Sequence, residues 1–238
     1  MSGEHLVKFL TAEKLSGAIP NPVKASKALP NYFKDIAPMS SSHPASATVK
    51  KCIPFLDAMS SGFIIPMWSD VFVTAKDGNI SVDFPQESLL DKQIASHGSV
   101  QIKNHPLWEK PYGQIALKWM NPWIIETQPG VSCLFTSPMN HLETRFKILD
   151  GVVDTDTYYS NINFPFLWTG GDGEFLIKKG TPLVQVIPFI RSEFSAEYGI
   201  IDKQKSTKAL ATIGSVMCNA YRENYWHKAK GKEPNEGT

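Results

Sequence analysis

Cysteine, long apolar runs and net charge are all scarce in this chain of 238 residues. The three cysteines, Cys52, Cys133 and Cys218, include no C-x-x-C pair, so neither a disulfide framework nor a cysteine zinc site is indicated. No run of about 18 apolar residues occurs, and the amino-terminal residues lack a basic segment followed by an apolar one. We therefore expect no membrane span, no export by a signal peptide, and a cytoplasmic location.

The charge is almost balanced, with 24 basic and 23 acidic residues and a formal net charge of +1. A chain without a strong field of either sign gives no reason to expect binding to nucleic acid or to an anionic membrane. A ligand, if there is one, must be recognised by a local site.

Proline and glycine are plentiful, at 17 and 16 residues, and most of them separate short β-branched and aromatic runs. This pattern favours short strands and ordered loops over helices. We predict a mainly β protein, with a β-clip-like or distorted-barrel form, and a single domain over residues 1–238. Its parts are a proline-rich wrap over 1–48, with an opening strand over 5–10 and no regular elements over 19–48, a β core over 49–200, a helix over 201–229 and a flexible tail over 230–238.

Helical spacing predicts a short helix over residues 53–60 and a long carboxy-terminal helix near 203–228. Lys76-Asp77-Gly78-Asn79 indicates a β-hairpin turn. Residues 85–111 are rich in polar residues, and we expect them to form a loop that crosses between sheets.

Residues 148–191 form the most informative stretch. They predict a strand that enters a tight acidic turn at Asp154-Thr155-Asp156, another strand, a glycine-rich hairpin turn, and two more short strands that end at Arg191. If the protein has a small-molecule site, we expect the acidic turn to belong to it.

This stretch resembles the trimeric dUTPase and dCTP deaminase superfamily, which shares a β-clip fold. Gly151-Val152-Val153-Asp154 with Tyr158 resembles its G-[VI]-[IV]-D-x-x-Y turn, although the tyrosine stands one place late. Residues 179–189, KGTPLVQVIPF, resemble a later strand motif that contains Gln185, and Pro129-Gly130 resembles the proline-glycine that precedes an earlier strand. The resemblance covers roughly residues 129–191. It implies a dUTPase-like scaffold, a nucleotide or small anionic ligand, Mg²⁺ accompanying that nucleotide, and a homo-oligomer that would be a trimer.

The chain also departs from that superfamily. It lacks the arginine-serine-glycine phosphate motif, and Asn163-Phe164-Pro165 stands where the deaminases carry a glutamate. These departures count against hydrolysis, so the sequence does not decide whether the protein is an enzyme. Over its full length the chain resembles a family of tailed-phage and bacterial proteins without an assigned activity, through the segments at 50–66, 121–135 and 151–158. That resemblance implies a phage origin, action in the host cytoplasm, and, as an alternative function, a non-enzymatic structural or interaction protein.

The candidate catalytic residues are Asp154 and Asp156, because a rigid turn can hold a carboxylate beside a ligand. The alternative is an Asx-turn that only satisfies local backbone groups. The candidate ligand-binding residues are Tyr158 (or Tyr159), Arg145, Arg191 and Gln185. The tyrosines can stack on a ring or belong to the core, and the arginines can clamp an anion or form surface ion pairs.

A weaker alternative function is a non-haem iron oxygenase. His141-Leu142-Glu143 with His227 follows the H-x-[DE]…H order of the iron facial triad, a pattern that arises easily by chance in a chain with six histidines. The zinc deaminase signature is absent, and we assign no metal ligands. Cys52 follows two lysines but has no histidine placed to act as its base, so we interpret it as a structural residue.

Overall fold

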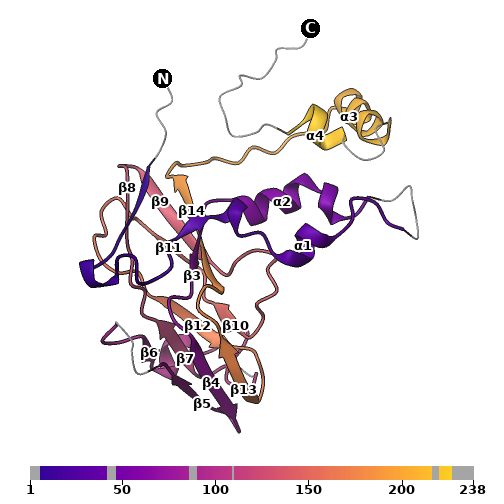
Figure 1. Cartoon of the computed structure of the whole chain (residues 1–238). Helices are drawn as coiled ribbons and strands as arrows, with labels where there is room; N and C mark the ends of the chain where they lie inside the picture. Colours follow the sequence, from indigo (N-terminus) through magenta and orange to yellow (C-terminus); the bar gives the residue numbers. More distant parts are fainter. Residues whose placement is uncertain (1–5, 42–46, 86–89, 109, 216–219, 227–238) are drawn as a thin grey trace. The chain divides into compact units, whose positions relative to one another are not determined.

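The computed structural model of the chain describes residues 6–41, 47–85, 90–108, 110–215 and 220–226 (Figure 1). Residue contacts divide the chain into two compact units. Unit 1 comprises residues 1–4, 29–58 and 192–238, and unit 2 comprises residues 5–28 and 59–191. The single domain expected from the sequence stays a prediction, because a compact unit is defined by contacts and a domain by independent folding.

Unit 2 is mainly β, as predicted, and its strands are antiparallel throughout the described pairings. A two-stranded sheet joins β1 (Val7–Leu10) and β8 (Ile124–Thr127). The other three sheets have the orders β10-β12-β7-β6, β11-β9-β14-β3-β2 and β13-β4-β5. The four-stranded sheet consists of β10 (Phe146–Ile148), β12 (Phe164–Trp168), β7 (Ala116–Trp119) and β6 (Ile94–His97).

The five-stranded sheet contains three strands, β9, β11 and β14, of the stretch 129–191 that resembles dUTPases. It consists of β11 (Gly151–Val153), β9 (Val131–Thr136), β14 (Pro182–Ile190), β3 (Phe63–Pro66) and β2 (Val23–Lys24). The middle strand β14 has four consecutive buried residues, Leu183 to Val186, as expected for a strand covered on both faces. The backbone of β14 packs directly against Gly62, since a Cβ added to Gly62 would lie 2.0 Å from the Val186 carbonyl oxygen. Gly62 also has a φ of +68°, so this position needs glycine for two reasons.

The predicted hairpin at Lys76-Asp77-Gly78-Asn79 is confirmed. It joins β4 (Val71–Lys76) to β5 (Asn79–Asp83), and Asp77 and Gly78 both have positive φ, at 49° and 77°. Two positive φ values are typical of the type I′ turn that matches the twist of a hairpin. In β4, buried Val71, Val73 and Ala75 alternate with exposed residues, so one face of this hairpin covers the core.

Two predictions within unit 2 are wrong. The glycine-rich turn after β12 is not a hairpin turn, because β12 pairs with β10 and β7 whereas β13 (Gly173–Ile177) pairs with β4. Residues 85–111 are not only a loop, since they contain β6 and the 3-10 helix η4 (Ser99–Ile102). β13 pairs with β4, far earlier in the chain, and β6 pairs with the next strand, β7, across the segment that contains η4, so local turn composition could not identify either pairing.

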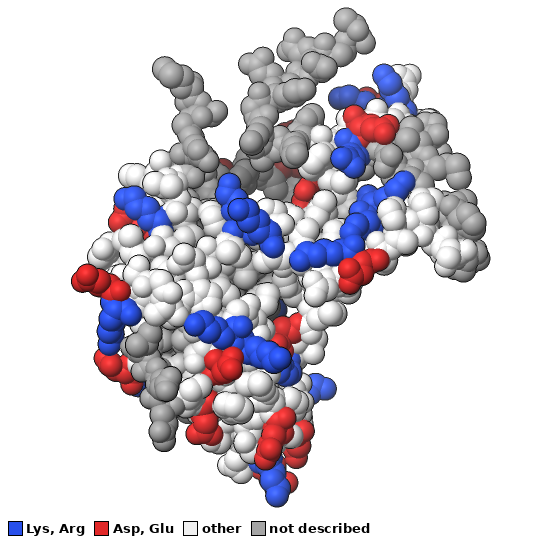
Figure 2. Space-filling model, in the orientation of Figure 1, with Lys and Arg blue, Asp and Glu red and all other residues white. Residues whose placement is uncertain are grey.

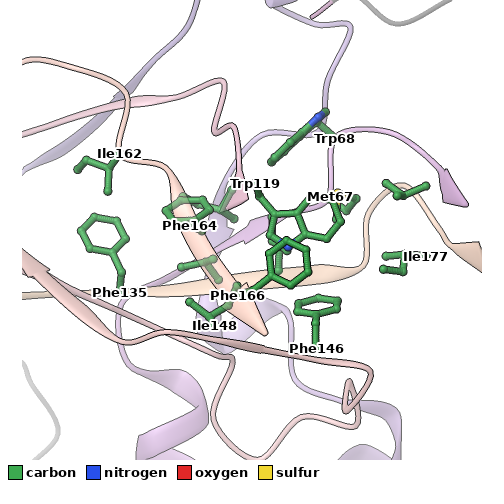
Figure 3. Close-up of a cluster of buried hydrophobic side chains, with 14 of the residues drawn as sticks. Met67, Trp68, Trp119, Phe135, Phe146, Ile148, Ile162, Phe164, Phe166 and Ile177 are labelled. Atoms are coloured by element: carbon green, nitrogen blue, oxygen red, sulfur yellow. The ribbon is translucent and has the colours of Figure 1, made fainter. Parts of the chain in front are cut away.

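One hydrophobic core serves all the larger sheets of unit 2. Trp119 of β7 stacks on Phe166 of β12 at 4.4 Å between ring centroids, and Phe146 of β10 packs edge-on against both rings. Figure 3 shows this aromatic group together with Met67, Trp68, Ile148 and Ile177. Figure 2 shows positive and negative side chains interspersed around the unit on the face that it draws, in agreement with the balanced composition.

Unit 1 contains the helices. These are α1 (Asn31–Asp35), the first part of α2 (Ile53–Ser60), α3 (Lys203–Ser215) and α4 (Ala220–Asn224). The helix predicted over 53–60 is confirmed at both ends, and the one predicted near 203–228 is confirmed as α3 and α4, with 216–219 and 227–228 outside the described residues. The prediction of no regular elements over 19–48 is wrong for residues 23–27, which form β2 and a 3-10 helix, and for residues 31–35, where extended Pro30 precedes a turn of helix. The predicted flexible tail also lies outside the described residues.

The described helices are all too short or too polar to cross a bilayer. Residues 192–202 join β14 to α3 without regular structure.

Candidate functional site

The acidic turn follows the edge strand β11 and is built from its own backbone. Asp154 O accepts hydrogen bonds from Thr157 N at 3.1 Å and from Tyr158 N at 2.9 Å. Thr155 is buried at 2% exposure, and its hydroxyl lies 2.7 Å from that of Thr127. The side chain of Thr155 therefore anchors the turn in the core while its two acidic neighbours lie nearer the surface.

The structure brings Arg191 together with both aspartates of the turn. Arg191 Nη1 donates to Asp156 Oδ1 at 2.8 Å and to Ser132 Oγ at 2.9 Å, and its Nη2 donates to Asp156 Oδ2. Ser132 Oγ in turn donates to Asp154 Oδ1 at 2.6 Å, and Gly130 N donates to Asp156 Oδ2 at 2.8 Å. This network joins the turn to β9 and to the end of β14.

The two carboxylates of the turn differ in accessibility. The Asp156 side chain is only 6% exposed, and the Arg191 guanidinium and the Gly130 N–H lower its pKa to about 2. The Asp154 side chain is 59% exposed, and its Oδ2 accepts no hydrogen bond from the residues that the structure describes. Of the pair, Asp154 is the carboxylate that a ligand can reach.

The tyrosines after the turn line an open cavity of about 760 Å³ in unit 2. Tyr158 and Tyr159 are 48% and 67% exposed, and two basic side chains, Lys14 and Lys92, lie on the same cavity. Lys14 is paired with Asp91 at 3.6 Å, although both side chains are largely exposed. The cavity is lined by Leu10, Thr11, Ala12, Lys14, Leu15, Leu90, Asp91, Lys92, Met120, Asn121, Pro122, Ile124, Tyr158, Tyr159, Ser160, Asn161 and Asn163.

Three asparagines fix one wall of this cavity. Asn161 Nδ2 donates to Asn121 O at 2.9 Å, and Asn121 N donates to Asn163 Oδ1 at 3.1 Å. The Asn121 side chain is buried and bridges to both backbone groups of Trp123. Asn163 Nδ2 has no hydrogen-bond acceptor among the described residues, so it is a donor available to a ligand.

Arg145 and Gln185 do not join the acidic turn. Arg145 binds Glu143 through Nε at 2.8 Å and through Nη2, and it donates to Leu176 O at 2.7 Å. Glu143 raises the pKa of Arg145. Gln185 is fully buried in β14, where it accepts from Met139 N at 2.9 Å and donates to Ser61 O at 2.8 Å. A ligand contact by either residue stays a prediction.

The iron-triad hypothesis gains no support from the described residues. The Glu143 carboxylate is engaged by Arg145, and His227 lies outside the described part of the chain. Burial lowers the pKa of His141, whose Nε2 is buried without a hydrogen-bond partner. Within the described ranges, no three His, Cys, Asp or Glu residues are grouped to hold a metal ion. Cys52 is an exposed free thiol, and burial raises the pKa of Cys133.

Sequence reasoning identified the turn and its tyrosines but missed the rest of the cavity. Lys14, Lys92, Asn121 and Asn163 come from segments far apart in the chain. No motif connects them. Opposite charges at Asp156 and Arg191 were the only signal for the ion pair, and they are 35 residues apart.

Comparisons with known proteins return dUTPase structures. The chain is similar to EIAV dUTPase at 12% identity and a TM-score of 0.32, over 60% of this chain and 86% of that one. It is also similar to a variant of the dUTPase from phage phi11 of S. aureus, at 11% identity and a TM-score of 0.35, over 84% and 98% of the two chains. A dUTPase variant of Staphylococcus bacteriophage 80alpha, with dUpNHpp, gives 10% identity and a TM-score of 0.34, over 85% and 94%.

No protein-family model and no curated protein sequence matches the chain. The similar structures belong to the superfamily that residues 129–191 resemble. Because the identities and TM-scores are low, we infer neither an activity nor a ligand from them.

Proposed function

We propose that the protein binds a nucleotide or a similar small ligand that combines a flat ring with an anionic group, in the cavity beside the acidic turn. The observation that carries this proposal is the cavity of about 760 Å³ that places adjacent exposed tyrosines and two lysines around one space. Its volume lies within the range of small-molecule sites, which is roughly 300–1,000 Å³.

The chemistry of the lining residues suits the separate parts of such a ligand. An exposed tyrosine offers an aromatic face to a base, and stacking of this kind contributes about 1–3 kcal/mol. Lys92 has no ion-pair partner among the described residues, and Lys14 has only an exposed one, so both can receive phosphate or carboxylate oxygens. Asn163 Nδ2, which has no acceptor among the described residues, supplies a donor to a polar edge of the ring.

We assign the acidic turn a positioning role. Asp156 is held by Arg191 and Gly130, so its oxygens already have partners and its low pKa makes it a poor general base. Asp154 does not itself line the cavity, but its backbone carbonyl holds Tyr158, which does. Binding without hydrolysis agrees with the missing phosphate motif. Mg²⁺, if it participates, would arrive with a phosphorylated ligand.

A thermal-shift screen of deoxynucleoside mono- and triphosphates, with and without Mg²⁺, tests this proposal. We expect at least one of them to raise the melting temperature, because a ligand that binds only the folded state stabilises it. Pyrophosphate release from the triphosphates, measured in parallel, should stay at background. The absence of a shift with every nucleotide would contradict the proposal.

A second candidate function is a homo-oligomeric interaction protein, and the connector at 192–202 favours it. Phe194, Tyr198 and Ile200 are 92%, 95% and 100% exposed. Apolar side chains gathered in one exposed segment are typical of interaction surfaces. We propose that this connector packs against a second copy of the chain.

A further inference from the structure

Unit 1 contains a cavity of its own, separate from the nucleotide site proposed above. It has a volume of about 350 Å³ and is lined by Pro38, Lys50, Lys51, Ile53, Leu56, Arg222 and Trp226. Its walls thus combine three cationic side chains with apolar and aromatic ones, and no carboxylate lines it. We propose that this cavity is a binding site for a small oxyanion, a phosphate or carboxylate group, that carries an apolar or aromatic substituent.

Two of the cations have charge available for a ligand. Neither Lys51 nor Arg222 forms an ion pair with any residue that the structure describes, although the two come from opposite ends of the chain. Placing like charges around one cavity is unfavourable unless an anion or water screens them. An oxyanion between the two side chains would relieve that repulsion, and the guanidinium fork of Arg222 suits two of its oxygens.

The third cation, Lys50, is held by backbone carbonyl groups of α1. Its Nζ donates to Phe33 O at 2.7 Å and to Lys34 O at 2.8 Å, in the last turn of α1, and lies 5.0 Å from the Phe33 ring centroid. Lys50 is therefore fixed in position and adds its field to the cavity without being free to turn toward a ligand.

The start of α2 reinforces the positive field. Ile53, its first residue, lines the cavity, and the amino-terminal end of a helix carries a partial positive charge. Pro54 follows, which fits the first turn because the first N–H groups of a helix have no partner within it.

The apolar wall is also fixed in place. Trp226 Nε1 donates to Asp57 Oδ2 at 2.8 Å, which anchors the indole to α2 while the ring still lines the cavity. Leu56 completes this wall. A bare inorganic anion would leave the apolar side of the cavity unused, so we expect a ligand with a ring or alkyl group to bind more tightly.

Calorimetric titration of the full chain with phenyl phosphate, at low ionic strength, tests the site. We expect saturable binding that is tighter than the binding of inorganic phosphate, with no binding of neutral phenol. Benzoate titrated in parallel decides whether the preferred group is phosphate or carboxylate. Arg222→Gln and Lys51→Gln should each weaken phenyl phosphate about tenfold or more, since each removes a charged hydrogen-bond donor. Lys208→Gln, the same loss of charge on α3, should leave the affinity unchanged.

Arg222 is exposed, so its variant is expected to fold, and circular dichroism checks this for each protein. The proposal is overturned if phenyl phosphate does not bind the wild-type chain. It is also overturned if neither cavity variant weakens binding, or if Lys208→Gln weakens it as much as they do. Lys92→Ala, which changes the other cavity, separates this site from the nucleotide site: it should not affect phenyl phosphate bound in unit 1.

Discussion

The low pKa of Asp156 is due to two hydrogen-bond donors that lie next to it in space and far from it in sequence. The Arg191 guanidinium and the Gly130 N–H hold its pKa at about 2, below the ordinary value. A group whose pKa is lower in the folded protein than in the unfolded chain stabilises the fold above the unfolded pKa, which is about 3.9. That stabilisation is lost as the pH falls through the folded value.

We therefore expect Asp156→Asn to lower the urea midpoint at pH 5 to 7 and to have progressively less effect between pH 4 and pH 2. Urea unfolding followed by tryptophan fluorescence at a series of pH values measures this directly. Asp154→Asn is the matched control, and its effect should be smaller because the Asp154 side chain is mostly exposed. If the difference in urea midpoint between wild type and Asp156→Asn stays constant down to pH 2, the ion pair is not the cause of that difference.

At the scale of elements, β14 is held in place by a polar residue in its middle. Gln185 links the backbone at Met139 to the backbone at Ser61 while it is itself fully buried. The motif resemblance marked Gln185 as a candidate ligand contact, whereas the structure places it in an interior bridge. A glutamine within an apolar run is compatible with both roles, and only its partners, 46 and 124 residues away, distinguish them.

Replacing Gln185 by leucine should destabilise the chain by roughly 1–3 kcal/mol, because the partly buried Met139 N–H and Ser61 C=O lose the glutamine as their partner. Chemical denaturation of Gln185→Leu against wild type gives this value. Gln204→Leu, an exposed change of the same kind on α3, should stay within about 0.5 kcal/mol. A Gln185→Leu variant as stable as wild type would show that water or backbone shifts replace the bridge.

The elements also show where sequence reasoning succeeds. The helix α2 and the hairpin at Asp77-Gly78 were predictable because their signals are local: apolar spacing and turn residues. The order of strands in the sheets was not predictable, since β12 and β13 adjoin in sequence yet lie in different sheets. For the same reason the sequence indicated Tyr158 but not Lys92 or Asn163, which reach the same cavity through tertiary packing.

At the scale of the whole molecule, the connector at 192–202 bears on assembly. Its large apolar residues are almost fully exposed, and covering them would be favourable by about 25 cal/mol for each Å² of apolar surface. We expect the chain to form a homo-oligomer through this segment. The triple variant Phe194→Ser, Tyr198→Ser, Ile200→Ser should have a lower mass in light scattering than wild type at equal concentration.

Phe72→Ser, at a residue 51% exposed on β4, is the control for a general loss of apolar surface. A wild-type chain that is monomeric throughout the accessible concentration range would contradict the oligomer proposal. A trimer would agree with the superfamily that residues 129–191 resemble.

Calorimetric titration with the nucleotide that gives the largest thermal shift tests the proposed nucleotide site, the cavity beside the acidic turn, most directly. We expect Tyr158→Ala to weaken binding by about 1–3 kcal/mol, as loss of a stacking face does, while Tyr158→Phe keeps the ring and the affinity. Lys92→Ala should also weaken binding, and Lys76→Ala, on the β4–β5 hairpin outside the cavity, should not. Equal affinities for wild type, Tyr158→Ala and Lys92→Ala would contradict a nucleotide site at this cavity.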